Sequence, residues 1–249
     1  MKILVCISNV PDTTTKIKFL NNNTTFDSAG VQWIINPWDE LALTRAIELK
    51  EAHAGAVSEI TVVNVGLPTT EPTIRKALAI GADKAIRVNL DPKDAYTVAL
   101  QLSEIIKKDS FDIILCGIES SDYNGTSVGG MLSELLDFPS VSAVSFIDIE
   151  GDQLKLKREI DGGQEIIGIS TPFIGIVQKG IAKDARIPNM RGIMMAKTKP
   201  LQVVEPVSAD LYTDFVSFDY PKAKASCKKV DPDNVKELVN LLHNEAKVI

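Results

Sequence analysis

The stretch IILCGIESSDYNGTSVGGMLSELLD, residues 113–137, carries the clearest fold signal of this chain. It begins with an unbroken apolar run, Ile113 to Cys116, which is typical of a strand buried on both faces of a sheet. A polar loop follows over residues 119–125. A helix is expected after it, because apolar residues recur at helical spacing from Met131, and Thr126 or Ser127 can cap its start.

A strand, a polar loop with a glycine and a helix start in this order resemble an anion site. Free backbone N–H groups point outward at a helix N-terminus, and the helix dipole adds partial positive charge there. The same residue types also populate ordinary turns, and the loop matches neither G-x-G-x-x-G nor a P-loop. The residues alone therefore leave open both a phosphate site and an ordinary strand-to-helix turn.

Strands and helices alternate on the N-terminal side of this stretch. Helices are expected at residues 38–53, 72–80 and 94–107, and apolar strands at residues 2–8, 60–65, 85–88 and 111–116. This alternation predicts an α/β fold: a doubly wound, mostly parallel, Rossmann-like sheet of the adenine-nucleotide-binding kind, with helices on both faces. Ligands of such sheets bind beyond the carboxyl ends of the strands. The loops expected to meet at that edge are residues 6–10, 64–68 and 117–125, with a turn at residues 9–12. Residues 36–39 can join them if the chain folds back.

The pattern changes after Pro139. Short strands are expected at residues 140–150, 153–159, 165–170 and 172–177, with turns at 151–152 and 161–163, which predicts an antiparallel β extension. Residues 178–199 are basic and irregular, as a solvated surface loop is. An extended arm is expected from Pro200, and its terminal helix carries an apolar stripe suited to packing on another chain. We therefore expect a domain over residues 1–200 and an arm over 201–249.

Composition excludes several classes of function. The net charge is −6 and the pI about 5.1, which argues against a nucleic-acid partner held through its phosphates. No apolar run reaches the ~20 residues that span a bilayer. No His/Cys group has metal-ligand spacing, and no Ser-His or Cys-His pair is suggested, so no catalytic dyad is expected. The widely spaced Cys6, Cys116 and Cys227 are typical of reduced thiols in a cytoplasmic protein.

Several motifs resemble those of one family, the electron transfer flavoprotein beta subunit. The signature region is REIDGGQE at residues 158–165, followed by Pro172, IPNM at 187–190 and MMAK at 194–197. NPWDE at 36–40 and TIRKALAIGAD at 73–83 are also similar to that family, as is the stretch quoted first. The resemblance extends over residues 1 to about 200, with the motifs in the family's order.

The resemblance implies a heterodimer that carries electrons from flavoprotein dehydrogenases to a membrane or other acceptor. An alpha subunit would hold most of the FAD site, and the beta subunit would bind AMP, or a second FAD in electron-bifurcating relatives. The matching nucleotide-contacting positions are Cys6, Asn36, Pro37, Trp38, Asp39, Val65, Asp122, Asn124, Gly125, Thr126, Ser127, Val128, Gly129 and Gly130. The backbone N–H groups and hydroxyls around 124–129 would hold phosphate, and Asp122 or Asn36 the sugar or base.

The resemblance also implies two partner surfaces. Residues 178–199 match a recognition loop that docks dehydrogenases, so we expect a mobile docking surface with Ile187, just before Pro188, as its hydrophobic anchor. Glu165 matches an acidic residue that restrains the FAD domain through an ion pair across the subunits.

The sequence departs from the family in two places. VQKGIAKDAR at residues 177–186 replaces the usual Asp-Leu-Arg-Leu-Asn-Glu-Pro-Arg pattern. The partner dehydrogenases known for the family are therefore not assigned to this chain. TSVGG at 126–130 replaces the Thr-Ala-Gln-Val-Gly-Pro form of bifurcating relatives, which favours AMP over a second flavin. Two other hypotheses remain: a nucleotide-dependent transferase or hydrolase on the same fold, since fold does not decide function, and a stand-alone nucleotide-sensing module.

Overall fold

The computed structural model of the protein describes residues 1–151, 153–224 and 226–249. The first half contains β1 (Lys2–Cys6), β2 (Asn9–Pro11), β3 (Phe19–Leu20), β4 (Thr25–Phe26), β5 (Trp33–Ile35), α1 (Pro37–Ala52), β6 (Glu59–Val65), a 3-10 turn (Pro68–Thr70), α2 (Glu71–Ile80), β7 (Lys84–Val88), α3 (Ala95–Lys108) and β8 (Ile113–Gly117). The second half contains α4 (Val128–Leu136), β9 (Ser140–Glu150), β10 (Gln153–Ile160), β11 (Gly163–Ile169), β12 (Phe173–Val177), α5 (Met190–Ala196), β13 (Leu201–Val204), α6 (Val235–Asn240) and a π-helical turn (Leu241–Ala246).

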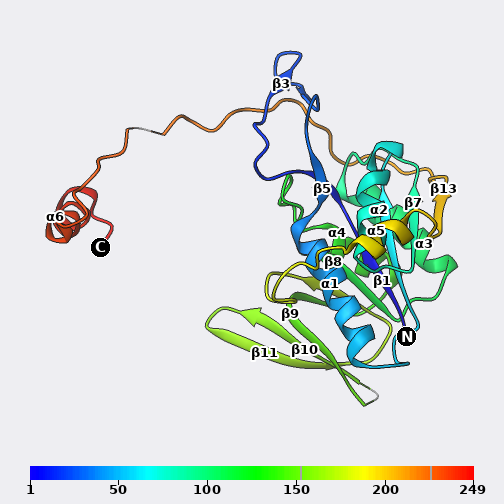
Figure 1. Cartoon of the computed structure of the whole chain (residues 1–249). Helices are drawn as coiled ribbons and strands as arrows, with labels where there is room; N and C mark the ends of the chain where they lie inside the picture. The colour runs from blue at the N-terminus through cyan, green and yellow to red at the C-terminus, as the bar shows by residue number, and fades with distance from the viewer. Residues whose placement is uncertain (152, 225) are drawn as a thin grey trace.

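Within the described residues, one nine-stranded sheet runs in the order β11-β10-β9-β12-β8-β1-β6-β7-β13. Every neighbouring pair from β9 to β13 along this order is parallel, whereas β9, β10 and β11 pair antiparallel. Figure 1 shows the long β9–β11 hairpins extending from one side of the sheet. The predicted fold class, a mostly parallel α/β sheet with an antiparallel extension, is confirmed.

Helices cover both faces of the parallel strands. On β1, Ile3 faces a core shared with Leu43 of α1 and Leu78 of α2, whereas the next residue, Leu4, faces a second core shared with α3 and α4. Ile3 and Leu4 have no solvent exposure. Burial on both faces explains why these strands are continuous apolar runs rather than alternating ones.

The strand order reverses direction between β1 and β8. From β1 the chain adds β6 and then β7 on one side, and it returns to the other side of β1 with β8. The loops after β1 and β8 therefore run to opposite faces of the sheet. This leaves a crevice at the carboxyl ends of the two strands.

Three local expectations were wrong. Residues 9–12, expected as a turn, include β2, which pairs antiparallel with β5. Residues 178–199, expected to be irregular, include the short helix α5. Residues 201–204, expected to begin the arm, form β13, which pairs in parallel with β7 and completes the sheet. The hairpin turn expected at 151–152 includes Asp152, which lies outside the described residues, as does Ala225 of the arm.

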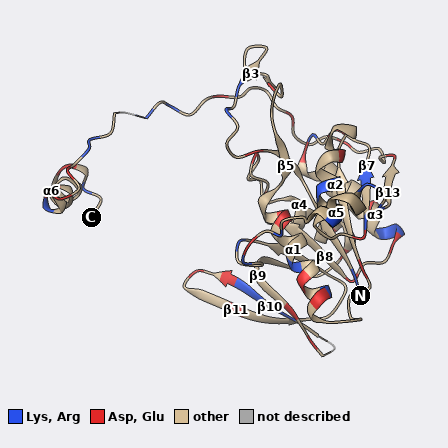
Figure 2. Cartoon of the chain, in the orientation of Figure 1, with Lys and Arg blue, Asp and Glu red and all other residues tan. Residues whose placement is uncertain are grey.

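The rest of the arm leaves the sheet. Figure 1 shows the chain running out as an extended segment with α6 at its far end. α6 begins one residue after Asn234, whose side chain accepts the Glu237 N–H at 3.2 Å, and no residue of α6 is buried. Figure 2 shows charges of both signs scattered over the elements rather than gathered on one face. None of the helices in the described residues has both the length and the apolar character needed to cross a bilayer.

Candidate functional site

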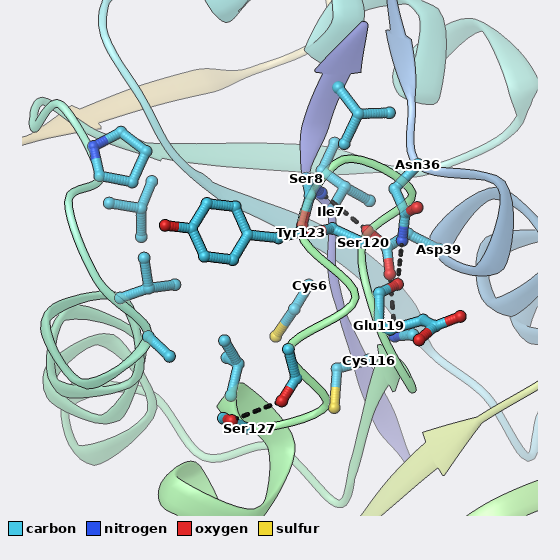
Figure 3. A pocket seen from close by; sticks show the side chains of 18 of the residues that line it. Cys6, Ile7, Ser8, Asn36, Asp39, Cys116, Glu119, Ser120, Tyr123 and Ser127 are labelled. Atoms are coloured by element: carbon cyan, nitrogen blue, oxygen red, sulfur yellow. Dashed lines mark hydrogen bonds between the residues drawn. The ribbon is translucent and has the colours of Figure 1, made fainter. Parts of the chain in front are cut away.

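A cavity of about 280 Å³ opens at the switch point between β1 and β8 (Figure 3). Its floor comes from the ends of β1, β6 and β8. Its walls are the loop after β1, the start of α3, and the loop that leads from β8 to α4. Residues far apart in the sequence meet here because parallel strands place their carboxyl ends at one edge.

Two buried side chains fix the loops around this cavity. The Asp39 carboxylate, in the first turn of α1, accepts the Ser8 N–H with one oxygen and the Gly117 N–H with the other, each at 2.8 Å. The Asn36 amide donates to Glu119 O at 2.8 Å and accepts the Ser121 N–H at 3.1 Å. These polar groups therefore hold the backbone after β1 and β8 in place (Figure 3). Gly117 is required at this junction, because a Cβ there would collide with the Asp39 carboxylate.

Burial also changes the acidity of Asp39. The side chain is 3% exposed, and its desolvation raises the pKa from 3.8 to about 6 although N–H donors around it act in the opposite direction. The Asp39 carboxyl therefore keeps its proton to a higher pH than an exposed carboxyl does.

The cavity floor is apolar and contains two cysteines, Cys6 at the end of β1 and Cys116 near the end of β8. Burial, with the nearby Asp39 charge, raises the pKa of Cys116 to about 12. Burial likewise raises the pKa of Cys6 well above its usual value. Both thiols therefore stay protonated and behave as small hydrophobic groups.

The junction before α4 is open to the cavity. Asn124 and Thr126 adopt left-handed conformations, with φ of 50° and 52°. Ser127, the N-cap residue, donates its hydroxyl to Gly125 O at 2.6 Å and makes no capping bond to the helix. The Ser127 side chain therefore accepts no hydrogen bond from the N–H groups in the first turn of α4.

The two glycines in the first turn of α4 have different roles. A Cβ on Gly129 would lie 2.7 Å from Ile176 Cγ1 and 2.9 Å from Cys116 Sγ, so Gly129 lets α4 pack closely on the sheet. A Cβ on Gly130 would meet nothing within 4 Å. Gly129 is a packing residue, and nothing in its surroundings requires Gly130 to be glycine.

The structure brings together most of the residues predicted for the site. Those that line the cavity are Cys6, Asn36, Asp39, Val65, Asp122, Gly125, Thr126, Ser127 and Val128. Pro37, Trp38, Asn124, Gly129 and Gly130 belong to the same segments but do not line it.

The sequence reasoning missed one wall of the cavity. Residues 92–95 and Val98, at the start of α3, line it. Tyr123 also lines the cavity and belongs to the loop expected at this edge. The signal for the α3 wall was present, because that segment follows β7, whose carboxyl end lies at the same edge as that of β1. Asp94 closes this helix start itself: one carboxylate oxygen accepts the Thr97 N–H at 2.7 Å.

The predicted partner-binding residues lie away from the cavity. Ile187 is 87% exposed, and Pro188 follows it just before α5. Exposed Met190 and Met194 extend the apolar surface along α5. Glu165 lies on the edge strand β11, where its carboxylate is 3.6 Å from the Arg158 guanidinium of the neighbouring strand.

The fold and the cavity define a class: a doubly wound α/β protein with its ligand crevice at the topological switch point of the sheet. Within that class, residues 23–209 match the electron transfer flavoprotein domain. The chain is 35% identical to electron transfer flavoprotein subunit beta of Bacillus subtilis, with both proteins covered completely. It is 33% identical to the human subunit beta, with 87% of this chain and 85% of the human protein covered. The chain belongs to the electron transfer flavoprotein beta-subunit family.

Proposed function

We propose that the chain is the beta subunit of a heterodimeric electron transfer flavoprotein and binds AMP as a structural ligand. The observation that carries the proposal is the open start of α4 at the rim of the switch-point cavity, in a chain whose relatives are named subunit beta. An electron carrier needs a bound redox group and partner surfaces rather than a catalytic dyad. A cytoplasmic location fits the two buried, protonated thiols.

The phosphate of AMP is assigned to the first turn of α4. The helix dipole and the N–H groups there favour an anion, and the hydroxyls of Thr126 and Ser127 lie at the same rim. The apolar floor at Cys6, Val65 and Cys116 suits the flat face of a base. Asn36 already uses its amide oxygen and one N–H on the loop backbone, so its contribution to the nucleotide is to hold that loop in place.

FAD would be held mainly by an alpha subunit, and it supplies the reversible uptake of electrons. In this proposal the beta chain contributes a rigid support and surfaces on which partners dock. AMP takes no part in electron transfer, because nothing in the proposed role requires chemistry at the nucleotide.

The docking surface for flavoprotein dehydrogenases is assigned to residues 178–199, with exposed Ile187 as anchor. The helix α5, within this stretch, is fixed to α2 by side chains that donate hydrogen bonds to carbonyl groups near the end of the other helix. The Arg75 guanidinium donates to Ala196 O and Lys199 O, each at 2.8 Å, and the Lys199 ammonium donates to Leu78 O at 2.9 Å. Gly192 permits the close approach, since a Cβ there would collide with the Ala79 carbonyl. The anchor is therefore presented beside a helix fixed on the body.

The second partner contact is assigned to Glu165, as an ion pair with the flavin domain of the alpha subunit. Its carboxylate is about half exposed and already faces Arg158. An exposed pair of this kind contributes roughly 0–1 kcal/mol, so Glu165 is free to exchange Arg158 for a cation of the partner at little cost.

Co-expression with the alpha subunit tests the proposal. A yellow complex should purify, with flavin absorbance following both chains through size exclusion. Reduction of its flavin by a flavoprotein dehydrogenase would establish electron transfer. A complex with neither flavin nor bound nucleotide would refute the proposal, and nucleotide hydrolysis by the isolated chain would favour an enzyme instead.

A further inference from the structure

The arm crosses the outer side of the cavity before it leaves the body, and we call residues 207–220 the strap. At its first residue, the Gln101 side chain pairs with both backbone groups of Val207, donating to the carbonyl and accepting the N–H, each at 2.8 Å. At its far end, the Phe218 N–H donates to Asn23 O at 2.7 Å. The strap is thus attached to α3 and to the β3–β4 hairpin.

Between these ends, the strap is bound to residues that line the cavity. Asp94 caps α3 with one carboxylate oxygen, and its other oxygen accepts the N–H groups of Tyr212 and Thr213 at 2.8 and 3.3 Å. Lys93 lines both the cavity and an outer hollow that strap residues 211–215 form with the β3–β4 hairpin. The start of α3 therefore serves the cavity on one side and the strap on the other.

A chain of aromatic rings joins the strap to the loop before α4. The rings of Tyr123 and Phe215 meet edge to face with centroids 5.3 Å apart. Phe215 then stacks on Phe218 at 5.3 Å, and Phe218 stacks on Phe19 of the hairpin at 4.9 Å. Tyr123 is the member of this chain that lines the cavity.

Tyr123 lies at the side of the cavity that faces the strap. Figure 3 shows its ring lying across the cavity. Tyr123 lines the cavity together with the loop before α4 and the start of α3, and burial and the carboxylates of Asp122 and Asp94 raise the pKa of its hydroxyl. A ligand that enters or leaves past this side must displace the ring.

We infer that the strap is a gate for nucleotide exchange and that the Tyr123–Phe215 contact is its latch. This inference rests on the proposed nucleotide site. Phe215 contacts the Tyr123 ring edge to face, and the strap anchors at Val207, Tyr212 and Phe218 hold Phe215 in that position. Opening the latch gives the nucleotide a way in and out without changing the groups that bind it.

The test uses the full chain, a fluorescent AMP analogue and stopped-flow measurement of association and dissociation rates. Phe215→Ala removes the latch ring. Val216→Ala is the matched control, because Val216 is the next residue of the strap and is 85% exposed. An edge-to-face ring pair of this kind is worth enough to predict that both rates rise at least about threefold in Phe215→Ala. The dissociation constant should stay within about twofold, and Val216→Ala should behave as wild type.

Tyr123→Leu provides a second variant, which removes the ring but keeps an apolar side chain, and it should accelerate both rates. Because Tyr123 itself lines the cavity, the dissociation constant is used as a criterion only for Phe215→Ala. Unchanged rates in a folded Phe215→Ala protein would overturn the latch while leaving the nucleotide site intact. A faster dissociation with a proportional loss of affinity would also overturn it, because Phe215 would then be a binding residue. If the wild-type chain binds neither AMP nor the analogue in calorimetry, the nucleotide site and the gate both fail.

Discussion

Two helices, α3 and α4, begin at the cavity, and they differ in whether a side chain of the protein accepts their free N–H groups. At α3, the carboxylate of Asp94 accepts the Thr97 N–H, so the chain fills the N-terminus with its own anion. At α4, the hydroxyl of Ser127 turns back to Gly125 O and caps nothing. Both starts lie at one rim of one sheet. A helix N-terminus is thus a candidate anion site only where its own side chains leave its N–H groups without an acceptor.

Making α4 resemble α3 should have the largest effect. Ser127→Asp places a carboxylate where the phosphate is assigned, and like charges at one site cost a few kcal/mol. We expect AMP affinity to fall on the order of a hundredfold in calorimetry. Adenosine, which has no phosphate, serves as the matched ligand and should lose far less affinity. Equal losses for the two ligands would place the phosphate elsewhere.

Asp39 helps to position the loop that leads to α4, because its carboxylate accepts the Gly117 N–H at the end of β8. Its pKa is about 6 in the folded chain against an ordinary value of 3.8. Between these values the folded state binds more protons than the unfolded state. The free energy of unfolding contributed by this group is therefore present below about pH 4 and falls as pH rises through about 6, by about 3 kcal/mol in total.

Urea unfolding of wild type and Asp39→Asn at a series of pH values isolates this effect. Carboxyls with lowered pKa values, such as Asp109, act in the opposite sense and titrate in both proteins. The wild type should lose stability relative to the variant between about pH 4 and pH 6. If the difference in free energy of unfolding between the two proteins stays constant from pH 4 to pH 6, the pKa of Asp39 is not raised in the folded chain.

The two glycines of α4 allow the packing of the helix on the sheet to be tested separately from nucleotide binding. Gly129→Val should cost about 1–3 kcal/mol of stability, because its Cβ would meet Ile176 and Cys116, and it should weaken AMP binding by shifting the helix start. Gly130→Ala is the matched control in open space and should leave stability equal or raise it slightly. Chemical unfolding measures both variants. Equal stabilities would mean that α4 does not depend on close approach to the sheet.

Ile187→Ala tests whether the cavity and the docking surface act independently. Truncation of an interface hot spot costs more than about 1 kcal/mol of binding, so if Ile187 is the anchor, electron transfer from a partner dehydrogenase should slow about fivefold to tenfold. Flavin content and AMP affinity should not change, because Ile187 lies outside the cavity. Unchanged transfer rates in stopped-flow absorbance would remove the anchor assignment.

The smallest effect is expected from Glu165→Ala. Exposed ion pairs contribute under about 1 kcal/mol, so thermal stability should change little. The populations of flavin-domain orientations in the heterodimer, measured by small-angle scattering, should shift toward freer arrangements. Identical scattering profiles for variant and wild type would exclude the cross-subunit pair.

The sequence predicted the sheet and the rim well, because both follow from local signals. Apolar runs such as 113–116 identify strands buried on both faces, and parallel strands bring the loops at their carboxyl ends together. The sequence also predicted a helix start near Ser127. It allowed Ser127 to cap that helix, however, whereas the Ser127 hydroxyl donates to Gly125 O and makes no capping bond.

Long-range contacts account for what the sequence did not reveal. The roles of Asn36 and Asp39 depend on backbone groups more than 30 residues away. α5 is only seven residues long and contains Gly192, so it has no clear period, and the caps from Arg75 and Lys199 that hold it are tertiary. The strap has no secondary structure at all, and its place over the cavity follows from ring contacts that no spacing rule predicts.

Acid extraction of the purified heterodimer, followed by chromatographic identification of every released nucleotide, shows directly whether the beta chain holds AMP. We predict one FAD and one AMP per heterodimer, and loss of the AMP alone when the beta chain carries Ser127→Asp. Two equivalents of FAD, or FAD with no second nucleotide, would contradict the claim that the start of α4 holds the phosphate of AMP.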